Sequence, residues 1–289
     1  MDVKIANVQF RFEKYESFSD FEKQILGIFE NVPTDCDYVL FPELMTIGLL
    51  TTFEGYENFT SADNDKLHAY LEEYITLFNS IATSRKQVII AGSTVEKDGK
   101  DFYNTAYIFD GKGSYVKHRK THIFPAEAEW KAREGDVLDV FDIGPAKIAV
   151  ATCYEIEIPE ISTIYSRKGA EIIFCPSYTF TEHGFWRVRH CAESRAIENQ
   201  VYVVHSPIIG NIEGPVEPGY GKCSVITPCE PPWVANGIVI ESQVDTGDVL
   251  VTTLNIDTLY ERRENGVATT YNDRLRRKEL FQKYEEVIK

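Results

Sequence analysis

The sequence has little of what marks a disulfide-linked or metal-binding protein. Its six cysteines are scattered along the chain, with no C-x-x-C pair and no cluster of histidine and cysteine. Disulfide frameworks and zinc sites both need such residues at short, regular spacings. Neither a disulfide framework nor a metal site is therefore expected, and a cytoplasmic, reducing environment fits the composition best.

Long apolar runs and an excess of basic charge are also missing. No apolar stretch approaches the length that a membrane span needs, and residues 1–6 enter a strand pattern with no signal peptide. Thirty basic residues stand against 45 acidic ones, which gives a formal net charge of −15. Because nucleic acids and anionic membranes repel a field of this sign, neither is expected as a partner.

Internal repeats and linker-like breaks in composition are absent as well, which favours one domain over residues 1–289. The chain instead alternates short apolar segments of strand character with amphipathic segments of helical period. This order predicts an α/β protein with mixed sheets and helices outside them. Strands are predicted at 3–10, 37–41, 87–93, 102–109, 114–119, 137–143, 147–152, 171–175, 201–206, 222–227, 238–242 and 249–256. Helices are predicted at 18–29, 63–84, 159–168, 183–199 and 274–288, the last within a tail, about 271–289, that is a candidate interface.

Three polar residues stand at the ends of predicted strands that are far apart in the sequence: Glu43, Lys120 and Cys153. Strand ends are the usual place for a ligand in α/β proteins. A cysteine there can act as a nucleophile, and unpaired backbone N–H groups with their local dipole favour its thiolate form. A nearby carboxylate can serve as the general base and later activate water. A lysine, together with the backbone N–H of Tyr154, can stabilise the oxyanion of a tetrahedral intermediate.

Each of these residues also has an ordinary interpretation. A free cysteine is more often a small buried hydrophobe than a nucleophile. Glu43 can form a structural ion pair, and Lys120 belongs to the basic run 117–120, which can be a solvated face. The three together are more specific than any one of them, because they supply a nucleophile, a base and an oxyanion donor.

Three short segments surround these residues: Phe41-Pro42-Glu43-Leu44, Arg119-Lys120-Thr121-His122, and Cys153-Tyr154-Glu155 followed by Pro159-Glu160. Together they resemble the signature of the nitrilase superfamily of carbon–nitrogen hydrolases. The order glutamate, lysine, cysteine, with separations of 77 and 33 residues, is typical of that family. Strings at 169–173 and 195–200 are also common in it, so the resemblance spans nearly the whole chain.

The resemblance implies a four-layer α-β-β-α sandwich and a hydrolase that needs no cofactor and forms a homodimer or a larger assembly. By position, Glu43 would be the general base, Lys120 the oxyanion stabiliser and Cys153 the nucleophile. Members also carry a second active-site glutamate shortly after the lysine, and Glu127, seven residues further on, is the first choice. The alternatives for this second glutamate are Glu129, which is close, and Glu134, which is more distant.

One position departs from the family pattern. Many amidase-type members have an arginine four residues after the cysteine, where this chain has Glu157. The difference weakens any transfer of a substrate from the better-known members. Further along, Tyr178 and Trp186 are candidates to line an acyl pocket. Basic candidates to meet a substrate carboxylate are Arg187, Arg189 and His190.

The predicted function is that of an amidase: hydrolysis of a small amide to a carboxylic acid and ammonia, through a thioester on Cys153. A nitrile or an N-carbamoyl compound is the alternative substrate, because related members use similar machinery. A noncatalytic interaction protein that keeps the fold is the alternative from another class. It is disfavoured because all the catalytic residue types are intact.

Overall fold

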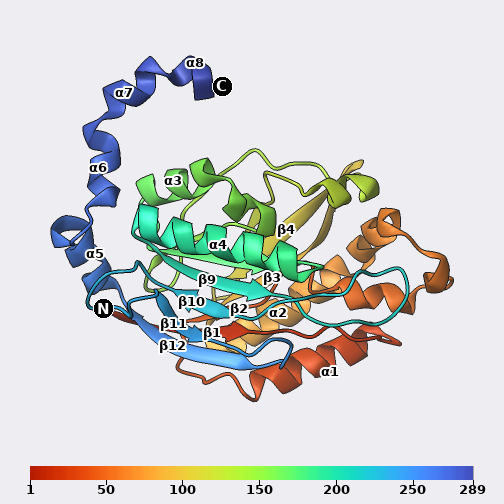
Figure 1. Cartoon of the computed structure of the whole chain (residues 1–289). Helices are drawn as coiled ribbons and strands as arrows, with labels where there is room; N and C mark the ends of the chain where they lie inside the picture. The colour runs from red at the N-terminus through yellow and green to blue at the C-terminus, as the bar shows by residue number, and fades with distance from the viewer. Residues whose placement is uncertain (289) are drawn as a thin grey trace.

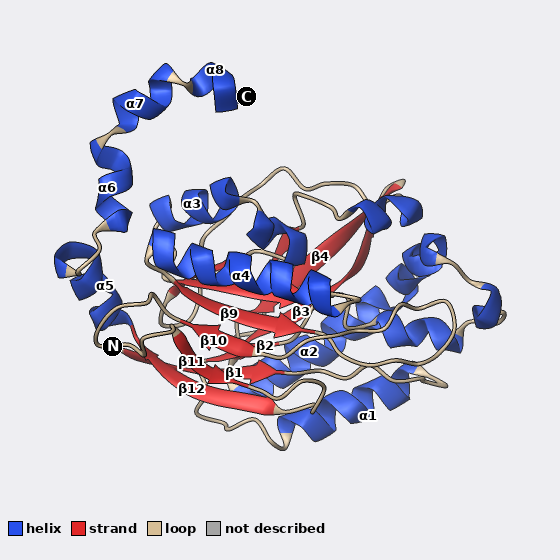
Figure 2. Cartoon of the chain, in the orientation of Figure 1, coloured by secondary structure: helices blue, strands red, loops and turns tan. Residues whose placement is uncertain are grey.

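Two six-stranded sheets form the centre of the computed structural model, which describes residues 1–288 (Figures 1 and 2). In each sheet, three neighbouring strands run parallel and the outer strands pair antiparallel. The first sheet has the order β12 (Val249–Asn255), β1 (Asp2–Val8), β2 (Tyr38–Leu40), β3 (Val88–Asp98), β4 (Asp101–Phe109), β5 (Tyr115–Arg119). The second has the order β11 (Ile238–Glu241), β10 (Ser224–Ile226), β9 (Tyr202–Pro207), β8 (Ile172–Ser177), β7 (Lys147–Val150), β6 (Phe141–Asp142).

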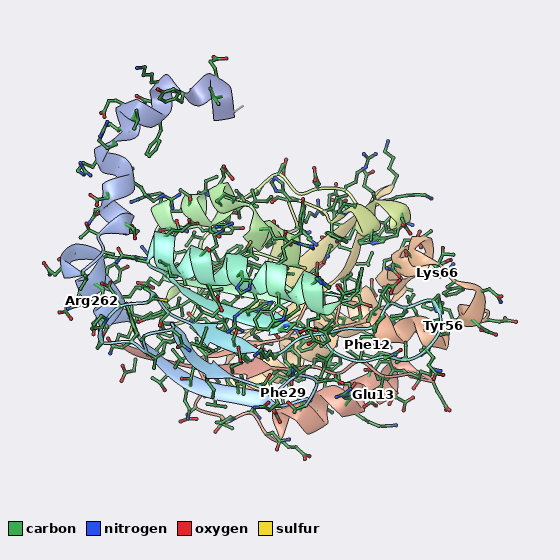
Figure 3. The ribbon with its side chains drawn as sticks, viewed as in Figure 1. Phe12, Glu13, Phe29, Tyr56, Lys66 and Arg262 are labelled. Atoms are coloured by element: carbon green, nitrogen blue, oxygen red, sulfur yellow. The ribbon has the colours of Figure 1, made fainter. Side chains whose placement is uncertain are left out.

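Helices cover the outer face of each sheet, which confirms the four-layer α-β-β-α sandwich. Apolar side chains of α1 (Phe18–Phe29) and α2 (Leu71–Arg85) pack on the first sheet, and those of α3 (Pro159–Arg167) and α4 (Glu182–Asn199) pack on the second. A third apolar cluster lies between the sheets, with Leu40 from one side and Val150 from the other. Side chains fill the space between the layers (Figure 3).

Short helices occupy the connections and the C-terminal end. The 3₁₀ helices are η1 (Ile47–Thr52), η2 (Tyr56–Asn58), η3 (Ser61–Tyr70), η4 (Pro125–Trp130) and η5 (Cys153–Glu157). The remaining α-helices are α5 (Ile256–Asn265), α6 (Thr270–Arg276), α7 (Lys278–Lys283) and α8 (Glu285–Ile288). Within residues 1–288, no helix is both long and apolar enough to cross a membrane.

The helix predicted at 18–29 is confirmed as α1, whose buried residues Phe21, Ile25 and Phe29 recur every four positions. The helix predicted at 63–84 is wrong in its first half, because η3 is a 3₁₀ helix and α2 begins only at Leu71. Leu67 is the one buried residue of η3. This segment therefore lacks the apolar stripe that would hold a continuous α-helix against the sheet.

Two further predictions differ from the structure. The strand predicted at 137–143 is reduced to β6, because Leu138 and Val140 pack on the apolar layer under α3 and α4 instead of pairing. The tail predicted as one helix at 274–288 consists of α6, α7 and α8, which extend away from the sheets (Figure 1). Residue 289 of this tail lies outside the described residues. The chain also forms α5, which was not predicted, capped by the Asn255 side chain.

A close approach of two strands positions the first of the candidate catalytic residues. Gly92 lies in β3 with a φ of +69°, at an irregularity in the pairing of β3 with β4. A Cβ atom on Gly92 would lie 1.8 Å from the carbonyl oxygen of Pro42, the residue before Glu43. Only glycine fits this position, because it tolerates both the left-handed backbone and the contact.

Substituting Gly92 with alanine should therefore destabilise the fold more than the same change at Gly99. Gly99 also has a positive φ, +60°, but a Cβ atom there has no neighbour within 4 Å. Gly99→Ala should lower the free energy of unfolding by about 1–2 kcal/mol, the strain of a left-handed residue. Gly92→Ala should lower it by about 1–3 kcal/mol more, because the neighbouring strand must move. Equal losses in urea unfolding would contradict the close approach.

Candidate active site

A cavity of about 420 Å³ lies where the ends of β2, β5, β7 and β8 come together. Each of these strand ends contributes a polar residue to its lining: Glu43, Lys120, Cys153 and Tyr178. The first two come from the first sheet and the other two from the second, so both sheets build the cavity. Glu127, Tyr154, Glu157 and Arg187 are also in the lining.

Lys120 is the centre of the polar groups in this cavity. Its side chain is 1% exposed, and its Nζ donates to Oε1 of Glu43 at 2.8 Å and to Oε2 of Glu127. The backbone N–H of Tyr178 donates to the other oxygen of Glu43 at 2.7 Å. The backbone N–H of Phe124 donates to Glu127 at 2.7 Å. The lysine therefore holds two buried carboxylates in fixed positions.

The charges of this group determine its protonation. Burial alone would lower the pKa of Lys120, but the charges of Glu127 and Glu43 outweigh it and raise that pKa, so the ammonium form is retained. Burial raises the pKa of Glu43, and the positive charge of Lys120 offsets part of this effect. A carboxylate with a raised pKa is a stronger proton acceptor than an exposed one.

Cys153 begins η5 directly beyond the loop that follows β7. Its φ is +49°, a left-handed conformation that is uncommon for a residue with a side chain. Burial and the charge of Glu43 raise the pKa of its thiol well above the ordinary value, and the nearby Lys120 only partly opposes them. The expectation that the strand end itself favours the thiolate is therefore wrong. The thiol holds its proton until a base takes it.

Asn104 was missed by the sequence analysis. It is buried in β4, and its Nδ2 donates to Glu43 at 2.9 Å and to Glu127 at 2.7 Å. Asn104 thus bridges the two carboxylates that Lys120 also joins, and completes the network around both. A polar residue inside an otherwise apolar strand segment was the only signal for it in the sequence.

A family model described as carbon-nitrogen hydrolase matches residues 4–263 of the chain. The chain belongs to the carbon-nitrogen hydrolase family. It is 35% identical over 280 residues to "Probable hydrolase YhcX" of Bacillus subtilis, and the match covers 95% of this chain and 54% of that protein. It is 33% identical over 140 residues to "Omega-amidase NIT2-B" of Xenopus laevis, and this match covers 45% of this chain and 51% of that protein. The chain thus spans about half the length of these relatives.

The fold of the chain is also that of solved structures. The crystal structure of Saccharomyces cerevisiae Nit3, a member of the nitrilase superfamily, superimposes with a TM-score of 0.75 at 24% identity. The match covers 93% of this chain and 95% of that one. Membership of the nitrilase superfamily, which the sequence motifs indicated, is confirmed.

Glu155 is a second residue whose contacts the sequence did not reveal. It is fully buried, and its carboxylate lies 2.9 and 3.0 Å from Nε2 of His118. It also accepts from the backbone N–H and the hydroxyl of Thr121 at 2.8 and 2.7 Å, and from the N–H of Thr152 at 2.7 Å. One carboxylate therefore connects the segment that carries Lys120 to the segment that carries Cys153.

The other candidates for the second glutamate have no bond to Lys120 among the described residues. Glu127 is buried and bonded to Lys120, whereas Glu129 is exposed and has no hydrogen bond within residues 1–288. Glu134 accepts a long hydrogen bond from the N–H of Ile123 at 3.4 Å. The geometry thus brings Glu127 to the site, and places Glu129 at the cavity wall.

Only some of the residues that were predicted to contact the substrate line the cavity. Tyr178 lines the cavity, but Trp186 is outside the lining formed by the described residues, and its Nε1 donates to Glu182 at 3.2 Å. Arg189 is buried and paired with two glutamates, Glu193 and Glu241.

The remaining basic candidates are Arg187 and His190. His190 is exposed and lies 3.4 Å from Glu193. Arg187 reaches the cavity, but its Nε donates to both oxygens of Glu157 at 2.9 and 3.0 Å. The glutamate that replaces the usual arginine thus forms an ion pair at the cavity wall.

Metal ligands are not clustered in the part of the chain that the structure describes. No group of three or more His, Cys, Asp or Glu side chains has an arrangement that could hold a metal ion there. The polar groups of the cavity are instead engaged with one another and with backbone N–H groups.

The pairing of Glu155 should be measurable as stability. Burial alone would raise the pKa of Glu155, but His118 and Thr121 more than offset it and lower that pKa. A lowered pKa means that the ionised carboxylate stabilises the fold at pH values above its ordinary pKa of about 4.3 and loses this effect on acidification.

Glu155→Gln should accordingly lower the free energy of unfolding by about 1.5–3 kcal/mol at pH 7. The difference from the wild type should shrink as the pH falls below about 4. Glu160→Gln, an exposed glutamate of α3, is the matched control and should cost less than about 1 kcal/mol. A difference that widens on acidification, in urea unfolding at several pH values, would contradict the assignment.

Proposed function

We propose that the protein is an amidase that hydrolyses a small amide to a carboxylic acid and ammonia through a thioester on Cys153. The observation that carries the proposal is the convergence of Cys153, Glu43 and Lys120 on one cavity, with Lys120 bonded to both buried glutamates. These groups provide a nucleophile, a base and a fixed positive charge within one buried site.

In the first half of the reaction, Glu43 accepts the proton of the Cys153 thiol as the sulfur attacks the amide carbon. The raised pKa of Glu43 supports this role, because it makes the carboxylate a stronger proton acceptor than an exposed one. The ammonium of Lys120 and the backbone N–H of Tyr154 stabilise the oxyanion that forms. Glu43 then gives its proton to the nitrogen, the C–N bond breaks, and ammonia leaves.

In the second half, water cleaves the thioester. Glu43, again a carboxylate, takes a proton from the water as its oxygen attacks the acyl carbon. The same donors stabilise the second oxyanion, and the C–S bond breaks. Glu43 returns the proton to the sulfur, so the carboxylic acid leaves and the enzyme is restored. Glu127 and Asn104 act as positioning residues, because each is bonded to the Lys120–Glu43 pair.

An amide is the favoured substrate over a nitrile or an N-carbamoyl compound. The identity to a protein named omega-amidase supports this choice. The machinery would serve all three, so a nitrile must be tested as a separate substrate, whereas an N-carbamoyl compound is distinguished by its products. Purified protein should release ammonia from small amides without carbon dioxide, whereas an N-carbamoyl compound would yield both. Failure to release ammonia from any amide in a broad panel would refute the proposal.

Cys153→Ala should abolish turnover while the fold is retained. We expect a loss on the order of 10⁴-fold or more in kcat, because no other group can form the thioester. Cys229→Ala, an exposed cysteine outside the cavity, is the control and should keep full activity. Mass spectrometry of acid-quenched wild type should find the acyl group on Cys153 alone. Circular dichroism would verify the fold, and residual activity in a folded Cys153→Ala protein would refute the mechanism.

Glu127→Gln should lower kcat by about 10²-fold with a smaller change in KM, because Lys120 loses one of its two anchoring charges and shifts. Glu134→Gln removes a carboxylate of the same loop that is outside the cavity lining, and should leave kcat unchanged. Steady-state kinetics on one amide would compare the two. Equal rates for both variants would exclude a role for Glu127.

A further inference from the structure

The cavity lining carries far more negative than positive charge. Five glutamates line it, against one lysine, one arginine and one histidine. Glu43, Glu127 and Lys120 belong to the catalytic group at its inner end. The carboxylates that remain are Glu129, Glu157 and Glu217, and the one arginine beside them is Arg187.

That basic residue is already neutralised. Arg187 and Glu157 form an ion pair with Nε 2.9 Å from the nearer carboxylate oxygen, and Glu157 is 13% exposed. The carboxylates of Glu129 and Glu217 have neither a hydrogen bond nor an ion pair within residues 1–288. Among the described residues, the outer part of the cavity therefore has two exposed carboxylates without a partner and no lysine or arginine without one.

Aromatic rings line the same cavity as these carboxylates and indicate what the cavity could bind. Tyr178 and Phe180 form an edge-to-face pair with ring centroids 4.7 Å apart, and Phe124 packs edge-to-face on Tyr154 at 5.8 Å. All four line the cavity. Aromatic faces attract organic cations, and low-dielectric walls strengthen the field of nearby carboxylates.

The loop that carries Glu217 is fixed over the cavity by one of these rings. The hydroxyl of Tyr178 donates to the backbone carbonyl of Glu217, and Tyr178 itself donates its N–H to Glu43. Tyr178 thus contacts both Glu43 of the catalytic group and the backbone of the loop that carries Glu217.

We propose that the substrate is an amide that carries an alkylammonium group, with the amide at Cys153 and the ammonium between Glu217, Glu129 and the aromatic rings. This inference rests on the proposed amidase function for the reacting end, while the charge preference rests on Glu129 and Glu217 in the outer part of the cavity. The same charges disfavour a dicarboxylic half-amide, the anionic counterpart.

Three amides of similar length test the proposal: 5-aminopentanamide, which is cationic, hexanamide, which is neutral and has the same number of non-hydrogen atoms, and glutaramate, which is anionic. Binding to the Cys153→Ala protein, measured by calorimetry, reports the charge preference without turnover. We expect 5-aminopentanamide to bind at least about tenfold more tightly than hexanamide at low salt, and this ratio to fall in 0.5 M salt. Equal or tighter binding of hexanamide or glutaramate, or no binding of 5-aminopentanamide, would overturn the inference.

Variants test whether Glu217 and Glu129 cause the preference for the cationic amide. Glu217→Gln and Glu129→Gln should each reduce the ratio of 5-aminopentanamide to hexanamide affinity several-fold. Glu213→Gln, an exposed glutamate of the same loop that is not in the lining, should leave the ratio unchanged. An equal reduction in all three variants would mean that overall charge, not the cavity wall, sets the preference, and would overturn the inference.

Turnover separates this inference from the proposed function. Hydrolysis of hexanamide or glutaramate as fast as 5-aminopentanamide by the wild-type protein would refute the charge preference and leave the amidase function intact. Tight binding of 5-aminopentanamide by the Cys153→Ala protein, with no ammonia released by the wild type, would refute the amidase function and support the cation site.

Discussion

One ammonium group, that of Lys120, makes the buried acidic site possible. Two carboxylates as deeply buried as Glu43 and Glu127 would repel each other and take up protons if nothing compensated their charge. Lys120 lies between them, and Asn104 donates to both, so each carboxylate has partners of complementary sign. Removing one member of such a buried group leaves an uncompensated charge, which costs several kcal/mol. The carboxylate that is proposed as the base is thus also part of what keeps the lysine charged.

The second constraint is that these groups come from different sheets. Glu43 and Lys120 follow strands of the first sheet, whereas Cys153 follows a strand of the second. Two contacts bind the sheets together at the cavity: the N–H of Tyr178 donates to Glu43, and Glu155 joins His118 and Thr121 to Thr152. Because each contact involves a fully buried carboxylate, neither is weakened by water. The position of the Cys153 thiol relative to the Glu43 carboxylate is therefore held from both sides.

Much of this arrangement could be predicted from the sequence, because it depends on local patterns. Predicted strands that end at a glutamate, a lysine and a cysteine indicated which strand ends would meet, and the four-residue recurrence in α1 indicated its buried face. Other features depend on contacts between distant segments and left no local pattern. Asn104 reads as one polar residue in a strand, and the Glu157–Arg187 pair joins residues 30 positions apart. The 3₁₀ conformation of η3 was hidden because Leu67 and Tyr70 keep the helical spacing of α2 in the sequence, although only Leu67 is buried in η3.

The apolar layer between the sheets determines more than stability. Leu40 and Val150 belong to this layer, and each stands three residues before a catalytic candidate, Glu43 or Cys153. Protein interiors are packed as densely as organic crystals, so an added or removed methylene is accommodated by moving the strands. A shift of one sheet against the other changes the distance from the thiol to the carboxylate. The apolar layer thus sets the distance between the two strand ends. Leu40 and Val150 therefore influence the reactivity of the Cys153 thiol, although neither side chain lines the cavity.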